Sequence, residues 1–257
     1  MPPSSSPPTA RQITGADRLL AAAVRLSGTL PVTRATLCVV RGRHPSDRER
    51  AGALRALLTE RGLPCLELGP APEPGERGGA QHGLPPRSVG LLVHTPGVRP
   101  EQAMRAAALW RLPLLIDRPD GVMGGGVPGT ALVGAGVSGA GTCRRDVIGI
   151  HLAGRGYELA LRQADLAPLR ADPGPIRLIL DNEKITMPDG RRLSVATTGT
   201  GLLEVRGESF GVRRVRRLRF ERAWGAHRLA VDGVPVREVR APLRMEADPG
   251  RLHLVSP

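Results

Sequence analysis

Hydrophobic residues in the first half of the chain follow two patterns that alternate with each other. Short, almost wholly apolar runs predict buried strands at 36–40, 64–68, 89–94 and 112–116. Apolar residues at helical spacing predict helices over 16–26, after the first strand and after the third. The second of these helices is predicted to begin at Ser46, which has capping-box spacing to Glu49, and the third at Pro100. Strands that alternate with helices predict an open, largely parallel α/β sheet.

Beyond a glycine-dense segment at 121–141, the pattern changes to strands without helices. Candidate strands lie at 146–152, 157–161, 176–180, 192–198 and 202–205. Near the C-terminus Leu243 and Met245 share one face, and Asp248-Pro249-Gly250 supplies a turn between two further strands. We therefore predict an N-terminal parallel α/β domain over 13–134 and an antiparallel, β-sandwich-like domain over 135–257. A Pro/Ser-rich segment over 1–12 is predicted to be disordered, and no internal repeat is recognised.

Composition adds one strong feature, which is positive charge. The 257 residues include 37 Lys and Arg against 24 Asp and Glu, giving a net charge of +13. This charge favours anionic partners such as phosphates, acidic lipid headgroups or nucleic acid, although a generally basic proteome explains it equally well. Aromatic residues make up only 2% of the chain, which argues against base stacking and makes nucleic acid the weakest of these partners.

Cysteines and apolar segments exclude several other classes. The 3 cysteines lack metal-ligand spacing, so neither a disulfide framework nor a zinc site is predicted. The N-terminal residues lack the features of a signal peptide, and no apolar run is long enough to cross a bilayer. The sequence predicts a cytoplasmic protein, with peripheral membrane contact left open.

The densest cluster of charge is a run of arginines that precedes the last strands. Its members Arg213, Arg214, Arg216 and Arg217 are candidates for contact with phosphates or an anionic surface. A solvated edge strand protected by charge explains the same run equally well. Both interpretations are kept.

The order of features in the last fifth of the chain resembles the C-terminal β-domain of the diacylglycerol kinase family of lipid kinases, which includes sphingosine kinases. A basic strand, a strand ending in Asp232-Gly233, an apolar strand from Leu243, a Pro249-Gly250 turn and a final strand follow in the family's order. The family has a glutamate after Asp-Gly, where this chain has Val234. The resemblance implies a nucleotide-binding-like α/β domain before the β-domain.

The resemblance also implies ATP-dependent phosphorylation of a lipid hydroxyl, with ATP and Mg²⁺ as cofactors. In the family, loops after strands one, three and four surround the phosphates. The matching positions here are Ser46, Thr95, Gly97, Gly129 and Thr130. The loops depart from the family motifs: the first lacks its asparagine, the second lacks its aspartate, and prolines at 96 and 100 reduce the backbone donors. The chain is therefore either an active lipid kinase or a degenerate paralogue that needs no cofactor.

Asp232 matches the aspartate that the family is taken to use as the base for the lipid hydroxyl. An Asp-Gly pair is also a common turn between strands, and this second interpretation is the stronger one. Two alternatives to a lipid kinase stay open. The first is a catalytically inactive binding or regulatory module that uses an interdomain cleft or the basic strand, and the second is a basic nucleic-acid-binding protein.

Overall fold

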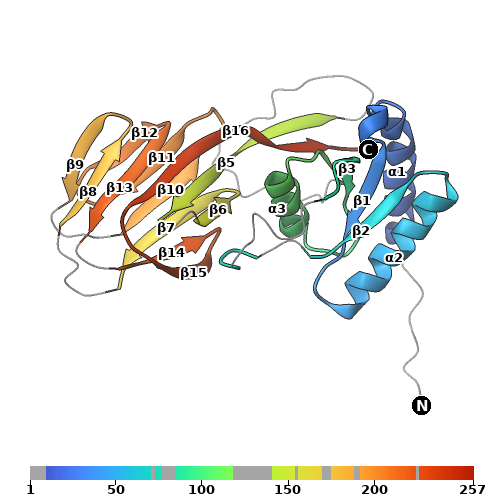
Figure 1. Ribbon diagram of the computed structural model, residues 1–257, viewed down its shortest axis with the longest axis horizontal. Helices are drawn as coiled ribbons and strands as arrows, with labels where there is room; N and C mark the ends of the chain where they lie inside the picture. The colour runs from blue at the N-terminus through green and yellow to red at the C-terminus, as the bar shows by residue number, and fades with distance from the viewer. Residues whose placement is uncertain are drawn as a thin grey trace, which may run out of the picture. The chain divides into compact units, whose positions relative to one another are not determined.

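The computed structural model describes residues 10–70, 73–76, 85–117, 141–153, 156–169, 175–187, 192–223 and 226–257. The chain forms two compact units, which are described separately. Unit 1 comprises Met1–Ala71, Pro85–Cys143 and His253–Pro257, and unit 2 comprises Pro72–Leu84 and Arg144–Leu252. The predicted fold class is confirmed, since a parallel α/β sheet is followed by an antiparallel β-sandwich (Figure 1).

Unit 1 is a parallel sheet with helices on both faces. Its strands are β1 (Thr36–Val40), β2 (Cys65–Leu68), β3 (Val89–Val93) and β4 (Leu114–Leu115), and its helices are α1 (Ala10–Ser27), α2 (Pro45–Glu60) and α3 (Pro100–Trp110), with a 3-10 turn η1 at Val32–Arg34. The strands lie in the order β2-β1-β3-β4, and the last residues of β16 (Leu243–Val255) pair with β4. All of these pairs are parallel. Helix α1 begins inside the segment predicted to be disordered, of which residues 1–9 lie outside the described residues.

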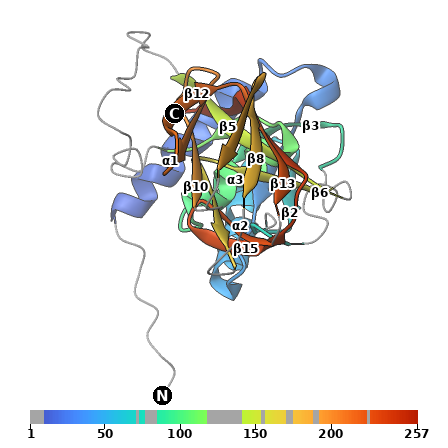
Figure 2. The same ribbon diagram turned by 90° about the vertical axis from the view of Figure 1, so that its left-hand side faces the viewer.

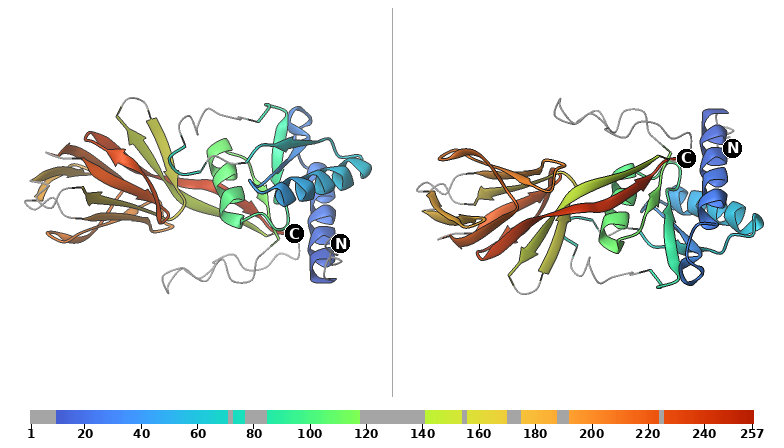
Figure 3. Two further views of the ribbon diagram at one scale, coloured as in Figure 1. Left: turned by 90° about the horizontal axis from the view of Figure 1, so that it is seen from below. Right: turned by 90° about the horizontal axis from the view of Figure 1, so that it is seen from above.

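The sheet of unit 1 is apolar on both faces because helices cover both. Leu37 and Val39 of β1 belong to one cluster with Leu91 and Val93 of β3 and with the apolar faces of α1 and α2. Figure 3 shows α3 on the opposite face of the sheet, where the alternate strand residues are equally buried. This double burial explains why the strands read as continuous apolar runs in the sequence.

Helix α2 begins two residues earlier than its spacing predicts. His44 is the N-cap, its ring nitrogen Nδ1 accepts a hydrogen bond from the Ser46 N–H at 3.3 Å, and the Asp47 carboxylate accepts one from the His44 N–H at 3.4 Å. Pro45 follows the cap because its fixed φ suits the first helical position and its missing N–H would have no partner there. The predicted cap at Ser46 is therefore wrong, whereas α3 begins at Pro100 as predicted.

Unit 2 is a sandwich of two antiparallel sheets, which Figure 2 shows from one end. Its other strands are β5 (Thr142–Leu152), β6 (Gly156–Ala160), β7 (Gln163–Pro168), β8 (Ile176–Leu180), β9 (Glu183–Met187), β10 (Leu193–Thr197), β11 (Leu203–Gly207), β12 (Gly211–Val215), β13 (Arg217–Ala223), β14 (His227–Val231) and β15 (Val234–Val239). Sheet A has the order β6-β5-β16-β13-β8-β9, and sheet B has the order β12-β11-β10-β7-β14-β15. The inward residues of both sheets form one core, in which Phe220 is fully buried.

The sandwich consists of two copies of one six-strand arrangement. Strands β5 to β10 form the first copy and β11 to β16 the second, and replacing each strand of one copy by its counterpart converts the order of sheet A into that of sheet B. The pairing register of the strands also agrees between the two copies. Leu166 of β7 lies opposite Leu193 and Leu229, and its counterpart Phe220 lies opposite Leu243 and Leu178. The expectation that the chain lacks an internal repeat is therefore wrong at the level of structure.

The two copies exchange their hairpins. Hairpin β8-β9 of the first copy pairs with β13 of the second, and hairpin β14-β15 of the second copy pairs with β7 of the first. Each copy also crosses from one sheet to the other between its second and third strands, from β6 to β7 and from β12 to β13. Neither copy can complete its sheets alone, so the whole of unit 2 must fold together.

The basic run is divided by one of these crossings. Arg213 and Arg214 lie on β12, at the edge of sheet B, whereas Arg217 begins β13 in the middle of sheet A. Arg216 lies between the two strands. The interpretation of this run as a single strand is wrong, because the chain changes sheets at Arg216. Among the described residues, no helix has both the length and the apolar content needed to cross a membrane.

Candidate functional site

The order of the strands in unit 1 reverses between β1 and β3, and this reversal locates a candidate site. From β1 the chain passes through α2 to β2 on one side, and β3 lies on the other side of β1. Helix α2 follows β1 and helix α3 follows β3 on the opposite face (Figure 3). In open α/β sheets the loops at such a reversal diverge and leave a crevice at the carboxyl ends of the two strands. The candidate site is therefore lined by residues 41–47 and 94–98, together with the first turns of α2.

The loop after β3 is a tight turn tied to β1. Residues 95–98 form a turn in which the Val98 N–H donates to the Thr95 carbonyl at 3.1 Å, with Pro96 and Gly97 at its centre and φ of 89° at Gly97. This is the residue pattern of a type II turn. The Thr95 hydroxyl donates to the Val40 carbonyl at 3.0 Å, so it joins the ends of β3 and β1. Because Val98 uses its N–H inside the turn and Pro96 has none, few backbone donors remain for a ligand.

Three arginines lie in or near these loops, and one of them, Arg41, lies 3.9 Å from the Glu67 carboxylate of β2. Arg41 and Arg43 follow β1, and the guanidinium group of Arg50, from the second turn of α2, lies against Gly97. Arg50 is half exposed, and its Nη1 lies 3.6 Å from the Asp47 carboxylate. Sequence reasoning missed Arg50. The available signal was its position on the first turns of a helix that starts at the carboxyl end of a parallel strand.

His94 lies at the base of this site and is buried. The ring nitrogen Nε2 of His94 lies 2.9 Å from the Val98 carbonyl, and the backbone N–H of His94 donates to the Leu115 carbonyl at 2.9 Å. Burial lowers the pKa of His94 below its ordinary value, against the opposing effects of the Val98 hydrogen bond and the charge of Asp117. The histidine is therefore neutral at pH 7 and connects the β3 turn to the end of β4.

The predicted nucleotide-site residues are only partly brought together. Ser46, Thr95 and Gly97 all lie at the carboxyl end of β1 and β3. The hydroxyl groups of Ser46 and Thr95 already make hydrogen bonds within the protein, and the guanidinium group of Arg50 lies against Gly97. Gly129 and Thr130 lie outside the described residues. Roles in binding remain predictions for all five residues.

Asp232 lies in unit 2, in the turn between β14 and β15. It has φ of 49°, and its carboxylate accepts three backbone hydrogen bonds, from the N–H groups of Leu161, Arg162 and Gln163 at 2.7, 2.8 and 3.0 Å. Its own N–H donates to the Gln163 carbonyl at 2.8 Å. Asp232 therefore holds the crossing between β6 and β7.

The counterpart of Asp232 in the other copy makes two of the three corresponding contacts. Asp181, with φ of 52°, lies in the turn between β8 and β9, and its N–H donates to the Arg217 carbonyl at 2.9 Å. Its carboxylate accepts from the N–H groups of Arg216 and Arg217 at 3.0 and 2.9 Å. Both aspartates thus fix the point where a strand of the other copy changes sheets. This equivalence supplies a structural reason for Asp232 that involves no catalysis.

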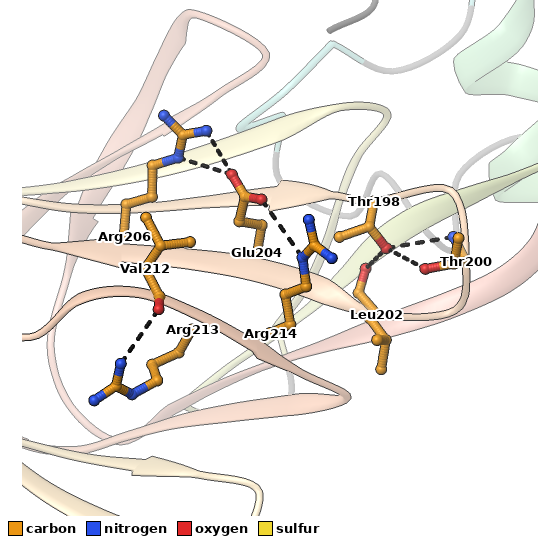
Figure 4. Close-up of polar contacts among 8 residues, drawn as sticks. All are labelled: Thr198, Thr200, Leu202, Glu204, Arg206, Val212, Arg213 and Arg214. Atoms are coloured by element: carbon orange, nitrogen blue, oxygen red, sulfur yellow. Dashed lines mark hydrogen bonds and ion pairs between the residues drawn. The ribbon is translucent and has the colours of Figure 1, made fainter. Parts of the chain in front are cut away.

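Figure 4 shows the two arginines of β12, of which Arg214 belongs to a small ionic cluster around Glu204. Glu204 on β11 accepts from Arg206 Nε at 2.8 Å and lies 3.9 Å from Arg214 Nε, while Arg213 donates to the Val212 carbonyl at 3.4 Å. All three arginines are exposed. Glu204 offsets part of their charge.

Nucleotides such as ATP are bound together with Mg²⁺, which prefers oxygen ligands. Within the described ranges, the structure contains no group of three or more His, Cys, Asp or Glu side chains that could hold a metal ion. The loops after β1 and β3 lie beside arginines, whose guanidinium groups are chemically suited to phosphate oxygens.

Comparisons with known proteins give structural likeness only. No family model matches the sequence, and no curated protein matches it. A solved structure described as "A putative diacylglycerol kinase from Bacillus anthracis str. Sterne" is 10% identical, with a TM-score of 0.46 over 88% of this chain and 99% of that chain. Yeast NADH kinase complexed with NADH is 12% identical, with a TM-score of 0.44 over 93% of this chain and 79% of that chain.

Proposed function

We propose that unit 1 binds a phosphate-bearing ligand of the nucleotide class at the carboxyl ends of β1 and β3. The observation that supports this proposal is the reversal of strand order at β1 and β3, with Arg50 against Gly97 and with Arg41 and Arg43 in the loop after β1. Guanidinium groups bind phosphate oxygens through two parallel hydrogen bonds and stay charged at any physiological pH. In this proposal the arginines supply most of the contacts that backbone amides make in glycine-rich phosphate loops.

Ligand-dependent thermal stability tests the proposal. A ligand present at 100 times its Kd and bound only to the folded state raises the free energy of unfolding by about 2.7 kcal/mol. For a chain of this size, that corresponds to a Tm increase of roughly 5–10 °C. We expect millimolar ATP with Mg²⁺ to raise the Tm in this range, and adenosine, which has no phosphate, to have no effect.

Two matched arginine variants test whether the ligand binds at this end of α2. Arg50→Gln should remove most of the ATP-dependent shift, because it deletes the guanidinium that lies against Gly97. Arg61→Gln removes the same charge just beyond the other end of α2, roughly 16 Å away at 1.5 Å per residue, and should retain the shift. No shift with wild-type protein, or equal losses in both variants, would contradict the proposal.

A second candidate function is phosphoryl transfer to a lipid hydroxyl with Asp232 as the base. The order of features near the C-terminus supports this candidate, whereas the three backbone hydrogen bonds of the Asp232 carboxylate favour a structural role. Asp181 provides the control, because it makes equivalent contacts and has no predicted part in catalysis. If Asp232 is a base, then lipid phosphorylation at 20 °C is lost in Asp232→Asn and retained in folded Asp181→Asn. Equal residual activity in the two variants would leave Asp232 as a structural residue.

A further inference from the structure

The outward face of sheet A in unit 2 carries an unusual concentration of positive charge. Among the side chains that the structure describes, the outward positions in the paired stretches of β9, β8, β13 and β16 include five cations and two carboxylates, Glu221 and Glu246. The five cations, called the cationic face from here on, are Arg177, Lys184, Arg217, Arg219 and Arg244, all of them exposed. They are close in space because neighbouring strands are about 4.8 Å apart.

One row of the cationic face is electrostatically unfavourable. Arg219 on β13 lies directly opposite Arg244 on β16, and on its other side Ile179 separates it from Lys184 of β9. Like charges placed directly opposite each other on a sheet are destabilising. Arg244 lies 3.3 Å from Glu246, but the side chains of Arg219 and Lys184 have no ion-pair partner among the described residues. The row therefore carries excess charge that the described parts of the chain do not neutralise.

The duplication in unit 2 shows that this charge is not required by the backbone. The counterparts of Arg217, Arg219 and Arg244 on sheet B are Gln163, Asp165 and Ser194, which occupy the same register positions. There the Gln163 side-chain amide donates to Asp165 at 2.9 and 3.0 Å and to Ser194 at 3.2 Å. The same backbone positions are thus occupied on sheet B by a hydrogen-bonded polar cluster, whose Asp165 also lies 3.4 Å from the guanidinium group of Arg192.

The remaining positions of the cationic face follow the same trend, with one exception. Lys184 corresponds to Pro235, because each lies opposite the outward residue of its hairpin, Ile179 or Ala230. Arg177 has a basic counterpart in Arg228 and is compatible with a purely solvating role. Four of the five cations are therefore particular to sheet A, and a requirement of the fold explains none of those four.

We infer that the cationic face docks the protein on an anionic phospholipid surface. The face is the open side of four adjacent strands, and its row from Lys184 to Arg244 spans roughly 14 Å at the usual strand spacing. Clusters of four to eight basic residues bind anionic bilayers through their phosphates, with a contribution that grows with each residue near the surface. A bilayer is favoured over nucleic acid because the cationic face has no aromatic side chain to stack on bases and no helix to enter a groove.

Vesicle sedimentation with the full chain tests this inference. We expect binding to vesicles that contain 30% phosphatidylserine at 50 mM salt, no binding to pure phosphatidylcholine, and release at 0.5 M salt because exposed charges are then screened. The variant Arg217→Gln/Arg219→Gln/Arg244→Ser gives sheet A two of the residues found on sheet B. Loss of three cations should lower the partition coefficient about a hundredfold.

A matched triple variant distinguishes this face from the chain's general charge. Arg206→Gln/Arg213→Gln/Arg214→Gln removes the same number of charges from the cluster of Figure 4, on the other sheet of unit 2. It should bind vesicles within about threefold of wild type, and both variants should unfold at unchanged temperatures. Equal losses in the two variants, or no binding by wild type, would overturn the inference. So would a sheet A variant that lost affinity for duplex DNA yet still bound vesicles.

Discussion

Replacing Asp232 with asparagine removes one of the two oxygens that hold the crossing between β6 and β7. The carboxylate accepts three backbone N–H groups, one through Oδ2 and two through Oδ1. Asparagine retains one oxygen, which can accept two of them, and turns an NH₂ group toward the third. The change therefore leaves the asparagine NH₂ group facing a backbone N–H group, so that one donor faces another. The left-handed backbone conformation of the turn is not disturbed, because asparagine tolerates it well.

The expected size of the effect follows from these contacts. A hydrogen bond to a charged group contributes about 1.5–3 kcal/mol, and a donor left without a partner costs about 1–3 kcal/mol. The Arg162 and Gln163 N–H groups are near solvent, so water replaces part of what they lose. We expect Asp232→Asn to lower the free energy of unfolding by about 2 kcal/mol, which is roughly 4–8 °C in Tm.

Asp181→Asn should cost less, and this ordering is the sharper part of the prediction. Asp181 accepts only two backbone N–H groups, and its Oδ1 contacts both at 3.0 and 2.9 Å. The one oxygen of asparagine can keep both bonds, so we expect a loss of about 1 kcal/mol or less. Thermal unfolding followed by circular dichroism measures both variants, with Asp17→Asn on the exposed side of α1 as the control for lost charge. If Asp232→Asn unfolded at the same temperature as Asp17→Asn, the structural role argued for Asp232 would be refuted.

Three further predictions concern unit 1. Thr95→Val should lower the free energy of unfolding by about 1 kcal/mol, because the Val40 carbonyl loses its buried hydrogen-bond donor. Urea unfolding measures this change, and an unchanged urea midpoint would contradict the role assigned to the Thr95 hydroxyl. The pKa of His94 in the folded state is lowered from 6.5, so the unfolded chain binds more protons as the pH falls. The free energy of unfolding should therefore fall below about pH 6.5, by up to about 1.4 kcal/mol per pH unit. This pH dependence should be weaker in His94→Asn. Partial burial raises the pKa of Cys65 to about 11, so alkylation of this thiol at pH 8 should be at least ~100-fold slower than that of free cysteine. Mass spectrometry of the labelled peptide measures the rate, and a rate comparable to that of free cysteine would contradict the raised pKa.

The sequence predicted unit 1 well because its strands are buried on both faces. Thr36–Val40, a compact apolar run, was predicted at its observed bounds. In unit 2, Ile176–Leu180 was also predicted at its observed bounds, and there the buried residues alternate with less buried ones. The missed strands β7 and β9 contain charged or proline residues that break their apolar alternation. In the basic run, the signal for a crossing was present but unused: Val215 and Leu218 are both buried, and their spacing of three cannot occur on one face of a regular strand.

The candidate site was less predictable than the fold. Thr95 and Gly97 were located correctly at a strand end, but only coordinates show that the Thr95 hydroxyl is already bound by Val40 and that Arg50 lies over Gly97. A motif specifies which residue types occur at a position, whereas the availability of their polar atoms depends on contacts from distant segments. The duplication of unit 2 was not recognised in the sequence, because few of the equivalent residues in the two copies are identical.

The duplication separates what the fold requires from what this chain has added to it. Asp181 and Asp232 are identical in the two copies, and both accept backbone hydrogen bonds from the point where a strand of the other copy changes sheets, so a structural requirement accounts for both. Arg219 and Asp165 occupy equivalent outward positions yet carry opposite charges, so no structural requirement can account for both. By this criterion the residue that best matches a catalytic motif is the one most simply explained by folding. Arg219 and Lys184, on the outward face of sheet A, have no ion-pair partner among the described residues, and the fold does not explain their charge.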